Sequence, residues 1–281
     1  MIDLLSHARL KSVNFDNSSS NRMPSIKFAK YQGAGNDFVI IDKRESNIEL
    51  TKYQIERICD RRFGVGADGL MFLEDSSSHD FKMIYFNSDG NESTMCGNGG
   101  RCLIRFAQQV GVITNNCHFV AIDGDHDGQI LSDGLIELKM TNTSLPIVKD
   151  NKQFLDTGSP HVVVLKEDIL EMDLVEEARK IRYGSVFKDN GTNVNFIQVK
   201  SDHIAIRTYE RGVEDETLAC GTGVTAAAII ANHQGWIKDN QVKVNALGGN
   251  LSVSFNKQKD GFIDVYLTGP AEFVFNGEID V

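Results

Sequence analysis

Long apolar runs are absent from this chain of 281 residues. Its longest aliphatic stretch, Ala226 to Ala231, is far shorter than the roughly 18 apolar residues that a transmembrane helix requires. Residues 1–22 also lack the apolar core of a secretory signal, and the acidic Asp3 and Asp16 are unlike an organelle-targeting peptide. We therefore expect a soluble protein with no membrane partner, and we predict that residues 1–23 form a disordered extension.

The chain has no excess of basic charge. It carries 29 Lys and Arg against 39 Asp and Glu, which gives a formal net charge of -10. A surface of this sign is unfavourable for a phosphate backbone or an anionic membrane, so nucleic acid is excluded as the main partner. A small polar molecule fits the composition better, and the length favours two domains.

Paired metal or disulfide motifs are missing as well. The five cysteines are an odd number, and neither Cys-x-x-Cys nor His-x-x-x-His occurs. These absences argue against a disulfide framework and against a zinc motif. We expect reduced thiols and a cytoplasmic location.

An internal repeat is what the sequence does contain. Short β-rich runs alternate with a few helical patterns, which predicts an α+β fold rather than a doubly wound one. The first half has predicted strands at 38–41, 70–73 and 82–86 and helices at 53–62, capped by Thr51 and stopped by Gly64, and from about 96 to 109. The second half has strands at 162–165, 194–197 and 204–207 and helices at 174–183 and from 220. This recurrence predicts two similar halves that face each other across a cleft.

Each half places a cysteine at the start of a helix. Residues 96–99 and 220–223 share the pattern Cys-Gly-x-Gly. The positive end of the helix dipole and the nearby amides are expected to lower the thiol pKa from about 8.5 towards neutrality. The glycines let the backbone approach a ligand, so their amides could hold a carboxylate.

Two such cysteines suit the inversion of a stereocentre. The reaction removes a proton from one face of a carbon and returns one to the other, so it needs an ionised and a protonated group on opposite sides. A single cysteine near glycines is more often structural, and the repeat favours catalysis. Cys59 and Cys117 are interpreted as core residues, and Cys102 lies too far along its helix to share the anion site.

The sequence resembles the diaminopimelate epimerase family, whose members work without pyridoxal phosphate. The resemblance runs from about Ile26 to Val281. It rests on the segments 33–38, 86–90, 95–102, 158–161, 193–196 and 210–212 followed by 219–223. It implies two pseudo-symmetric α+β domains, each a mixed sheet or barrel wrapped round a central helix. It also implies epimerisation of L,L-2,6-diaminopimelate to the meso isomer, a precursor of lysine and peptidoglycan.

The resemblance further implies a domain division and an assembly. Residues 24–141 with 269–281 would form the domain that contains Cys96, and residues 142–268 the domain that contains Cys220. The implied protein is a homodimer that binds an amino-acid substrate and uses neither a metal nor an organic cofactor.

Roles for single residues also follow from the resemblance. Cys96 matches the proton donor and Cys220 the proton acceptor in the direction from L,L to meso. The residues that match the turns receiving the reacting carboxylate are Gly97, Asn98, Gly221 and Thr222. The residues that match substrate contacts are Asn36, Asn87, Asn193, Glu210 and Arg211. His161 and Glu210 match groups that tune the ionisation of the thiols.

Several readings stay open from the residues alone. Asn36 could be an ordinary turn residue, Glu210 and Arg211 a solvated pair, and His161 a structural histidine. Some family members carry Gln and Asn where this chain has Gly69 and Ser159, which is expected to leave room for a different side chain.

Two alternative functions also remain. One is a racemase of the same fold that acts on another amino acid, such as proline or histidine. Proline-racemase relatives usually have Cys-Gly-His where this chain has Cys-Gly-Asn at 96–98, which counts against it. The other is a protein that binds an amino acid without exchanging its proton, and the presence of both cysteines counts against that.

Overall fold

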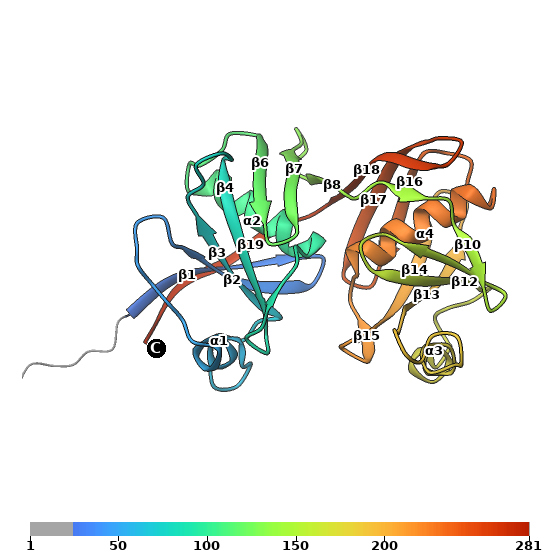
Figure 1. The fold of residues 1–281 in the computed structure, drawn as a ribbon, viewed down its shortest axis with the longest axis horizontal. Helices are drawn as coiled ribbons and strands as arrows, with labels where there is room; N and C mark the ends of the chain where they lie inside the picture. Colours follow the sequence, from blue (N-terminus) through green and yellow to red (C-terminus); the bar gives the residue numbers. More distant parts are fainter. Residues whose placement is uncertain (1–24, 281) are drawn as a thin grey trace, which may run out of the picture.

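The computed structural model describes residues 25–280, and the extension predicted for residues 1–23 lies outside the described residues. Two lobes lie side by side, each with strands around a long helix (Figure 1). The strand ladder continues from one lobe into the other, because β18 pairs with β17 of the second lobe and with β8 of the first.

The first lobe contains two helices and nine strands with partners in that lobe. The helices are α1 (Lys52–Cys59) and α2 (Gly97–Gln109). The strands are β1 (Ser25–Gly33), β2 (Asn36–Asp42), β3 (Gly69–Glu74), β4 (Phe81–Asn87), β5 (Glu92–Ser93), β6 (Asn116–Ala121), β7 (Gly124–Ile130), β8 (Ile136–Lys139) and β19 (Glu272–Asp280). Although β19 is the last strand of the chain, it pairs antiparallel with β1.

The second lobe has the same plan. Its helices are α3 (Leu174–Arg182) and α4 (Gly221–His233). Its strands are β10 (Ile147–Lys149), β11 (Lys152–Asp156), β12 (Pro160–Leu165), β13 (Asn193–Val199), β14 (Ile204–Glu210), β15 (Asp215–Thr217), β16 (Gln241–Ala246), β17 (Gly249–Lys257) and β18 (Gly261–Gly269). The short β9 (Thr143–Ser144) pairs with β18.

Strand pairing confirms the predicted repeat. In the first lobe β2 is parallel to β3 across α1, and β4 is parallel to β6 across α2. In the second lobe β12 is parallel to β13 across α3, and β14 is parallel to β16 across α4. The α+β class and the two repeated units with a central helix are therefore confirmed.

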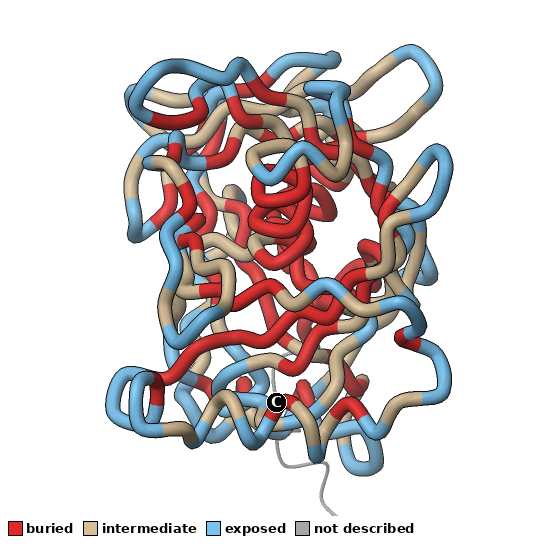
Figure 2. Tube along the Cα trace, turned by 90° about the vertical axis from the view of Figure 1, so that its right-hand side faces the viewer, coloured by how far each residue is buried: buried red, intermediate tan, exposed pale blue. Residues whose placement is uncertain are grey.

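A buried helix occupies the middle of each lobe, and Figure 2 shows one enclosed by strands. In α4, Ala226 to Ala231 are all fully buried, so the longest aliphatic stretch of the sequence is the core of the second lobe. Such a helix is apolar all round because strands cover every side of it. Among the residues from 25 to 280, no helix is both long and apolar enough to cross a membrane.

One helix is shorter than predicted. The pattern predicted a helix to residue 62 with its stop at Gly64, whereas α1 ends at Cys59. Asp60 has extended backbone angles, and its carboxylate accepts hydrogen bonds from the amides of Arg62 and Phe63 at 2.7 Å each. This local competition for backbone donors ends the helix one turn early. The predicted cap at Thr51 is confirmed.

Candidate active site

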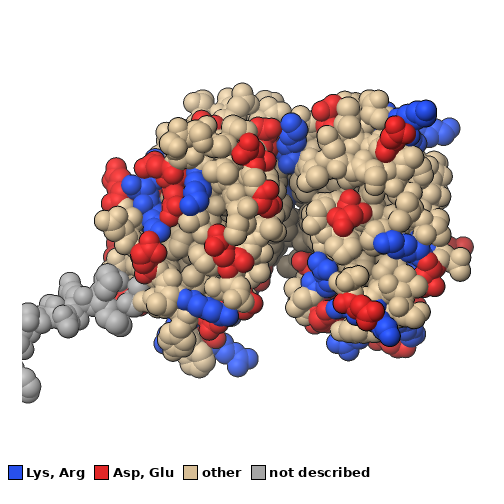
Figure 3. Space-filling view, in the orientation of Figure 1, with Lys and Arg blue, Asp and Glu red and all other residues tan. Residues whose placement is uncertain are grey.

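A cavity of about 760 Å³ lies where the two lobes meet, and both contribute to its wall. The first lobe supplies Asn36, Tyr85, Asn87 and Cys96, among others. The second lobe supplies Glu210, Arg211, Leu218 and Ala219, among others. The face in Figure 3 shows a groove between the lobes with acidic and basic side chains interspersed on both.

Of the predicted site residues, five line this cavity. They are Asn36, Asn87, Cys96, Glu210 and Arg211. The other predicted residues, all in the described part of the chain, are not among the residues that line it. They are Gly97, Asn98, His161, Asn193, Cys220, Gly221 and Thr222.

Cys96 is the N-cap residue of α2. Its backbone is extended, and its side chain makes no capping bond, so the thiol stays available at the helix N-terminus. The thiol donates to Asn36 Oδ1 at 3.7 Å, and the backbone amides of Gly99 and Asn98 bond to the sulfur. The predicted placement of this cysteine at a helix start is confirmed.

Cys220 occupies the equivalent position at α4. Its backbone is again extended, and its Sγ lies 3.4 Å from Thr222 Oγ1. Thr222 Oγ1 is in turn 2.9 Å from His161 Nε2. Asn195 Nδ2 lies 3.1 Å from the other ring nitrogen, Nδ1, and Asn193 Nδ2 lies 3.4 Å from Nε2. The Thr222 hydroxyl therefore stands between the imidazole and the sulfur of Cys220.

The expected lowering of the thiol pKa values is reversed. Burial raises the pKa of Cys96 and of Cys220, and it outweighs the backbone hydrogen bonds that lower them. The negative charge of Glu210 raises both further. Removing a thiolate from water therefore costs more free energy here than a helix N-terminus returns. Sequence spacing shows the helix start and gives no measure of this burial.

His161 is a neutral group in this structure. Its ring is fully buried, and burial together with the positive charge of Arg211 lowers the pKa of His161 to about 3. An imidazole that is uncharged at neutral pH does not stabilise a thiolate as a cation would. Its contact with Cys220 runs through the Thr222 hydroxyl.

A network of charged residues fixes Asn36 beside Cys96. Asn36 Nδ2 donates to Asp68 Oδ2 at 2.6 Å, and Arg61 Nη2 donates to Asp68 Oδ1 at 2.6 Å. Arg61 also binds Asp37, and its hydrogen bonds, with those of Lys30, hold the pKa of Asp37 well below its usual range although burial opposes them. With its amide nitrogen engaged, Asn36 presents its oxygen to the thiol. Sequence reasoning missed Asp68 and Arg61, since no spacing links them to Asn36.

The two helix N-termini touch. Asn98 Nδ2 donates to Ala219 O of the other lobe at 2.9 Å. A Cβ atom built on Gly221 would lie 3.6 Å from Gly97 Cα and 3.0 Å from Leu267 Cδ2. A side chain at residue 221 would therefore require Leu267 to shift by a few tenths of an ångström.

Arg101 supports this junction from behind. Its guanidinium is fully buried and donates to Gly97 O at 3.1 Å, to Asn98 Oδ1 at 2.8 Å and to Pro270 O at 3.3 Å. The sequence contains this arginine within a matched motif, but only the structure shows that it orients the Asn98 amide.

Glu210 and Arg211 stand at the cavity end of β14. Thr217 Oγ1 donates to Glu210 Oε2 at 3.1 Å, while burial and the nearby Asp68 raise the pKa of Glu210. Arg211 N donates to Asn193 Oδ1 at 2.8 Å, and its Nη1 donates to Asn190 O at 2.8 Å. Glu210 is partly buried, whereas Arg211 is exposed and its backbone amide and guanidinium are hydrogen-bonded to other residues.

The space beside Gly69 is occupied. A Cβ atom there would lie 2.6 Å from Phe86 O and 2.6 Å from the ring of Tyr85, so the expected room for a different side chain is absent at this position. Tyr85 fills it and lines the cavity. Ser159 instead accepts a hydrogen bond from Asn193 Nδ2 at 2.9 Å. Sequence analysis did not identify Tyr85 as a site residue. The alternating pattern of its strand indicates that the side chain is buried but not that it lines the cavity.

Comparison with known proteins agrees with this geometry. The sequence model of the diaminopimelate epimerase family matches residues 28–145 and 153–274. Diaminopimelate epimerase of Flavobacterium psychrophilum is 49% identical over 260 residues, which cover 90% of this chain and 100% of that protein. The enzyme of the same name from Chlorobaculum tepidum is 41% identical over 256 residues, 88% of this chain and 98% of that protein.

Solved structures share the fold at low identity. A Bacillus anthracis phenazine biosynthesis protein of the PhzF family has a TM-score of 0.70 and 19% identity, covering 92% of this chain and 100% of that one. A hydroxyproline epimerase from Agrobacterium vitis has a TM-score of 0.65 and 13% identity, covering 92% of each chain. Sequence and architecture agree: the chain belongs to the diaminopimelate epimerase family.

Proposed function

We propose that this protein is an isomerase that converts L,L-2,6-diaminopimelate to meso-diaminopimelate, in the synthesis of lysine and of a peptidoglycan precursor. The observation that carries the proposal is the pair of cysteines at the touching N-termini of α2 and α4, in a chain 49% identical to a protein of this name. Cys96 lines the cavity from the first lobe and Cys220 begins the equivalent helix of the second lobe, so the two lobes supply one thiol each, as inversion at a single carbon requires.

The substrate carboxylate binds where the two helices begin. The amides near Gly97, Asn98, Gly221 and Thr222 point out of the helix N-termini, and their partial positive charge stabilises the negative charge that grows as the α-proton leaves. Arg101 adds a buried positive charge behind the same point. Together they give the transition state a stabilisation that free thiols in water do not have.

Cys220 acts as the base in the direction from L,L to meso, and Cys96 returns a proton to the opposite face. The Thr222 hydroxyl, 3.4 Å from Cys220 Sγ, can donate to the thiolate. A buried thiolate with a raised pKa is a stronger base than an exposed one, which suits a weakly acidic α-proton. Two thiols complete this reaction without a metal or an organic cofactor.

The distal end of the substrate binds along β14. Glu210 offers a carboxylate to an ammonium group, and Arg211 offers a fork of donors to a carboxylate. Asn36 and Asn87 complete the polar wall, and Asn193 positions Arg211 by accepting a hydrogen bond from its backbone amide. Leu218 and Tyr85 limit its width.

We propose the domain division 24–141 with 269–281 and 142–268. The pairing of β19 with β1 supports it, since β19 returns to the first lobe.

We also propose a homodimer. It is supported by β19, on which Phe273, Val274 and Phe275 are each more than 40% exposed in the single chain. A cytoplasmic location suits a mechanism that needs two reduced thiols.

The proposal is tested by incubating the reduced protein with L,L-diaminopimelate in deuterated water. We expect inversion with uptake of one solvent deuterium at the α-carbon, and its loss in Cys96→Ala and in Cys220→Ala. Cys59→Ala is the matched control, because Cys59 is a buried cysteine in a separate cluster with Ile55 and Ile58.

Two outcomes would contradict the proposal. If the folded wild-type protein exchanges no α-proton of this substrate, the proposal is wrong, and other amino acids, proline and histidine first, become the candidates. Inversion that survives either cysteine substitution would rule out the two-thiol mechanism.

A further inference from the structure

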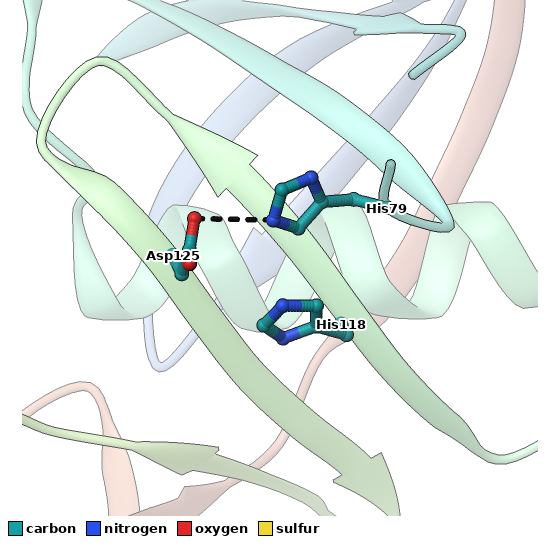
Figure 4. Close-up of side chains that lie close together, drawn as sticks. All are labelled: His79, His118 and Asp125. Carbon is teal, nitrogen blue, oxygen red and sulfur yellow. Dashed lines mark hydrogen bonds and ion pairs between the residues drawn. The ribbon is translucent and has the colours of Figure 1, made fainter. Parts of the chain in front are cut away.

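Three side chains outside the cavity converge on the surface of the first lobe. They are His79, which precedes β4, His118 on β6 and Asp125 on β7. One ring nitrogen from each histidine and one carboxylate oxygen of Asp125 all lie within 4.8 Å of one another. Figure 4 shows them gathered in front of the β6–β7 hairpin, with a helix behind the strands.

Strand register places these groups on one face. His118 pairs directly with Asp127, and Asp125 lies two positions along the same strand, so all three side chains leave the same side of the sheet. The burial pattern agrees, because Cys117 and Phe119 are buried on the opposite side. His79 joins them because Asp80 N bonds to His118 O at 2.9 Å.

Both imidazoles have a hydrogen-bonding partner at Nδ1. His79 Nδ1 is 2.8 Å from Ser78 Oγ, and His118 Nδ1 is 2.7 Å from Asp127 Oδ1. In His118 the Nδ1–H donates to the Asp127 carboxylate, which leaves the lone pair on Nε2. In His79 the Nε2–H donates to Asp125 Oδ1 at 3.1 Å, and a bound metal ion would replace that proton while Nδ1–H donates to Ser78 Oγ. An imidazole whose second nitrogen is held by a carboxylate or hydroxyl is the usual arrangement of a metal ligand.

The distances suit a tetrahedral ion. His79 Nε2 and Asp125 Oδ1 are 3.1 Å apart, close to the roughly 3.3 Å that separates two ligands of a tetrahedral zinc ion. The His79 and His118 rings are stacked with centroids 4.6 Å apart. His118 is half exposed, so its ring can turn through the remaining gap without disturbing the core.

The surrounding charge favours a cation. Asp80 Oδ2 accepts from the amide of His118 at 2.7 Å, and Asp127 is only partly neutralised by Lys139, whose Nζ is 3.3 Å away. We propose that His79, His118 and Asp125 bind one divalent transition-metal ion of the zinc type, with solvent as the fourth ligand. The ion would join the turn before β4 to the β6–β7 hairpin. The sequence shows no zinc motif because the ligands come from three separate segments.

The test measures binding of Zn²⁺ alone by calorimetry to the full chain. The background carries Cys96→Ser and Cys220→Ser, so that the active-site thiols contribute nothing. We expect one equivalent bound at micromolar concentration, and affinity at least about tenfold weaker in His79→Asn and in His118→Asn. His203→Asn is the control, since His203 forms a surface pair with Asp202 at 2.8 Å and should leave binding unchanged.

A second readout locates the ion. Long-range proton–nitrogen spectra of the histidine rings should shift for His79 and His118 when Zn²⁺ is added, and His203 should stay unchanged. Absence of binding at micromolar Zn²⁺ would overturn the proposal, as would binding that keeps its full strength in both histidine variants. In the wild-type cysteine background, His118→Asn should retain epimerase activity, because the active-site cavity is lined by other described residues.

Discussion

At the scale of single residues, burial decides the chemistry of this site. Both helix-capping thiols have raised pKa values, and the buried histidine behind them is neutral. Sequence spacing located the cysteines and the glycines after them. The surroundings that set their charge come from Glu210 and Asp68, which are distant in sequence and meet only in the folded protein.

Replacing Glu210 with Gln should make Cys96 more reactive. Burial raises the pKa of this thiol and the Glu210 charge raises it further, so removing the charge should shift the pH midpoint of Cys96 alkylation down. Mass spectrometry of iodoacetamide-treated protein over a pH series measures the midpoint. Asp89→Asn is the control, because Asp89 also lines the cavity but is not among the groups that shift Cys96. Equal midpoints for Glu210→Gln and wild type would contradict the assignment.

The buried, neutral His161 should make the free energy of unfolding fall as the pH is lowered into mild acid. Its pKa is about 3 when folded and 6.5 ordinarily, so the unfolded chain takes up a proton first as pH falls. The stability present above pH 6.5 is therefore lost between pH 6.5 and about 3, by about 2 kcal/mol from pH 7 to pH 5. Urea unfolding at both pH values should show a smaller difference for His161→Gln. A variant with the same pH dependence as wild type would mean that His161 is not the group responsible.

At the scale of elements, the sequence predicted the four helices described between residues 25 and 280 but only six of the nineteen described strands, namely those whose apolar pattern is regular. The predicted end of α1 was wrong because the Asp60 carboxylate accepts hydrogen bonds from two backbone amides after the helix. The parallel pairs β4–β6 and β14–β16 could not be predicted, since a period of two shows which face is buried and not which strand lies beside it.

The N-terminus of α1 offers a direct test of local stabilisation. Thr51 accepts from Gln54 N, and Thr51 N donates to Gln54 Oε1 at 2.8 Å, which together form a capping box. Thr51→Ala should lower the free energy of unfolding by about 1 kcal/mol. Urea denaturation measures this, and Thr51→Ser should keep most of the stability. An equal loss in both variants would show that the hydroxyl is not the stabilising group.

At the scale of the whole molecule, the site depends on how closely the lobes approach. Gly97 and Gly221 allow the helix N-termini to meet, and Leu267 Cδ2 lies against both. The sequence predicted two halves facing a cleft. It could not show this contact, because Leu267 belongs to β18, the strand that links the two lobes.

Gly221→Ala should separate the helices slightly and reduce catalysis more than stability. The added Cβ would lie 3.0 Å from Leu267 Cδ2, a contact relieved by a shift of a few tenths of an ångström. Because a misplacement of about 1 Å can lower the rate roughly 100-fold, we expect this smaller shift to lower kcat/KM roughly tenfold. Steady-state kinetics and thermal unfolding measure the two effects. Because the obstructing atom belongs to Leu267, the double variant Gly221→Ala, Leu267→Ala should recover part of the activity. No recovery would mean that the helix contact itself, and not this leucine, limits the approach.

The return of β19 to β1 has a consequence for biosynthesis. Ser25 and Glu278, which are hydrogen-bonded across this strand pair, lie 253 positions apart in the chain. A ribosome needs on the order of tens of seconds to add that many residues. The second lobe emerges as a nearly continuous segment before β19 does. The first lobe, although translated earlier, must wait with an unpaired strand edge for its last partner, so it is the lobe that depends more on protection by chaperones during synthesis.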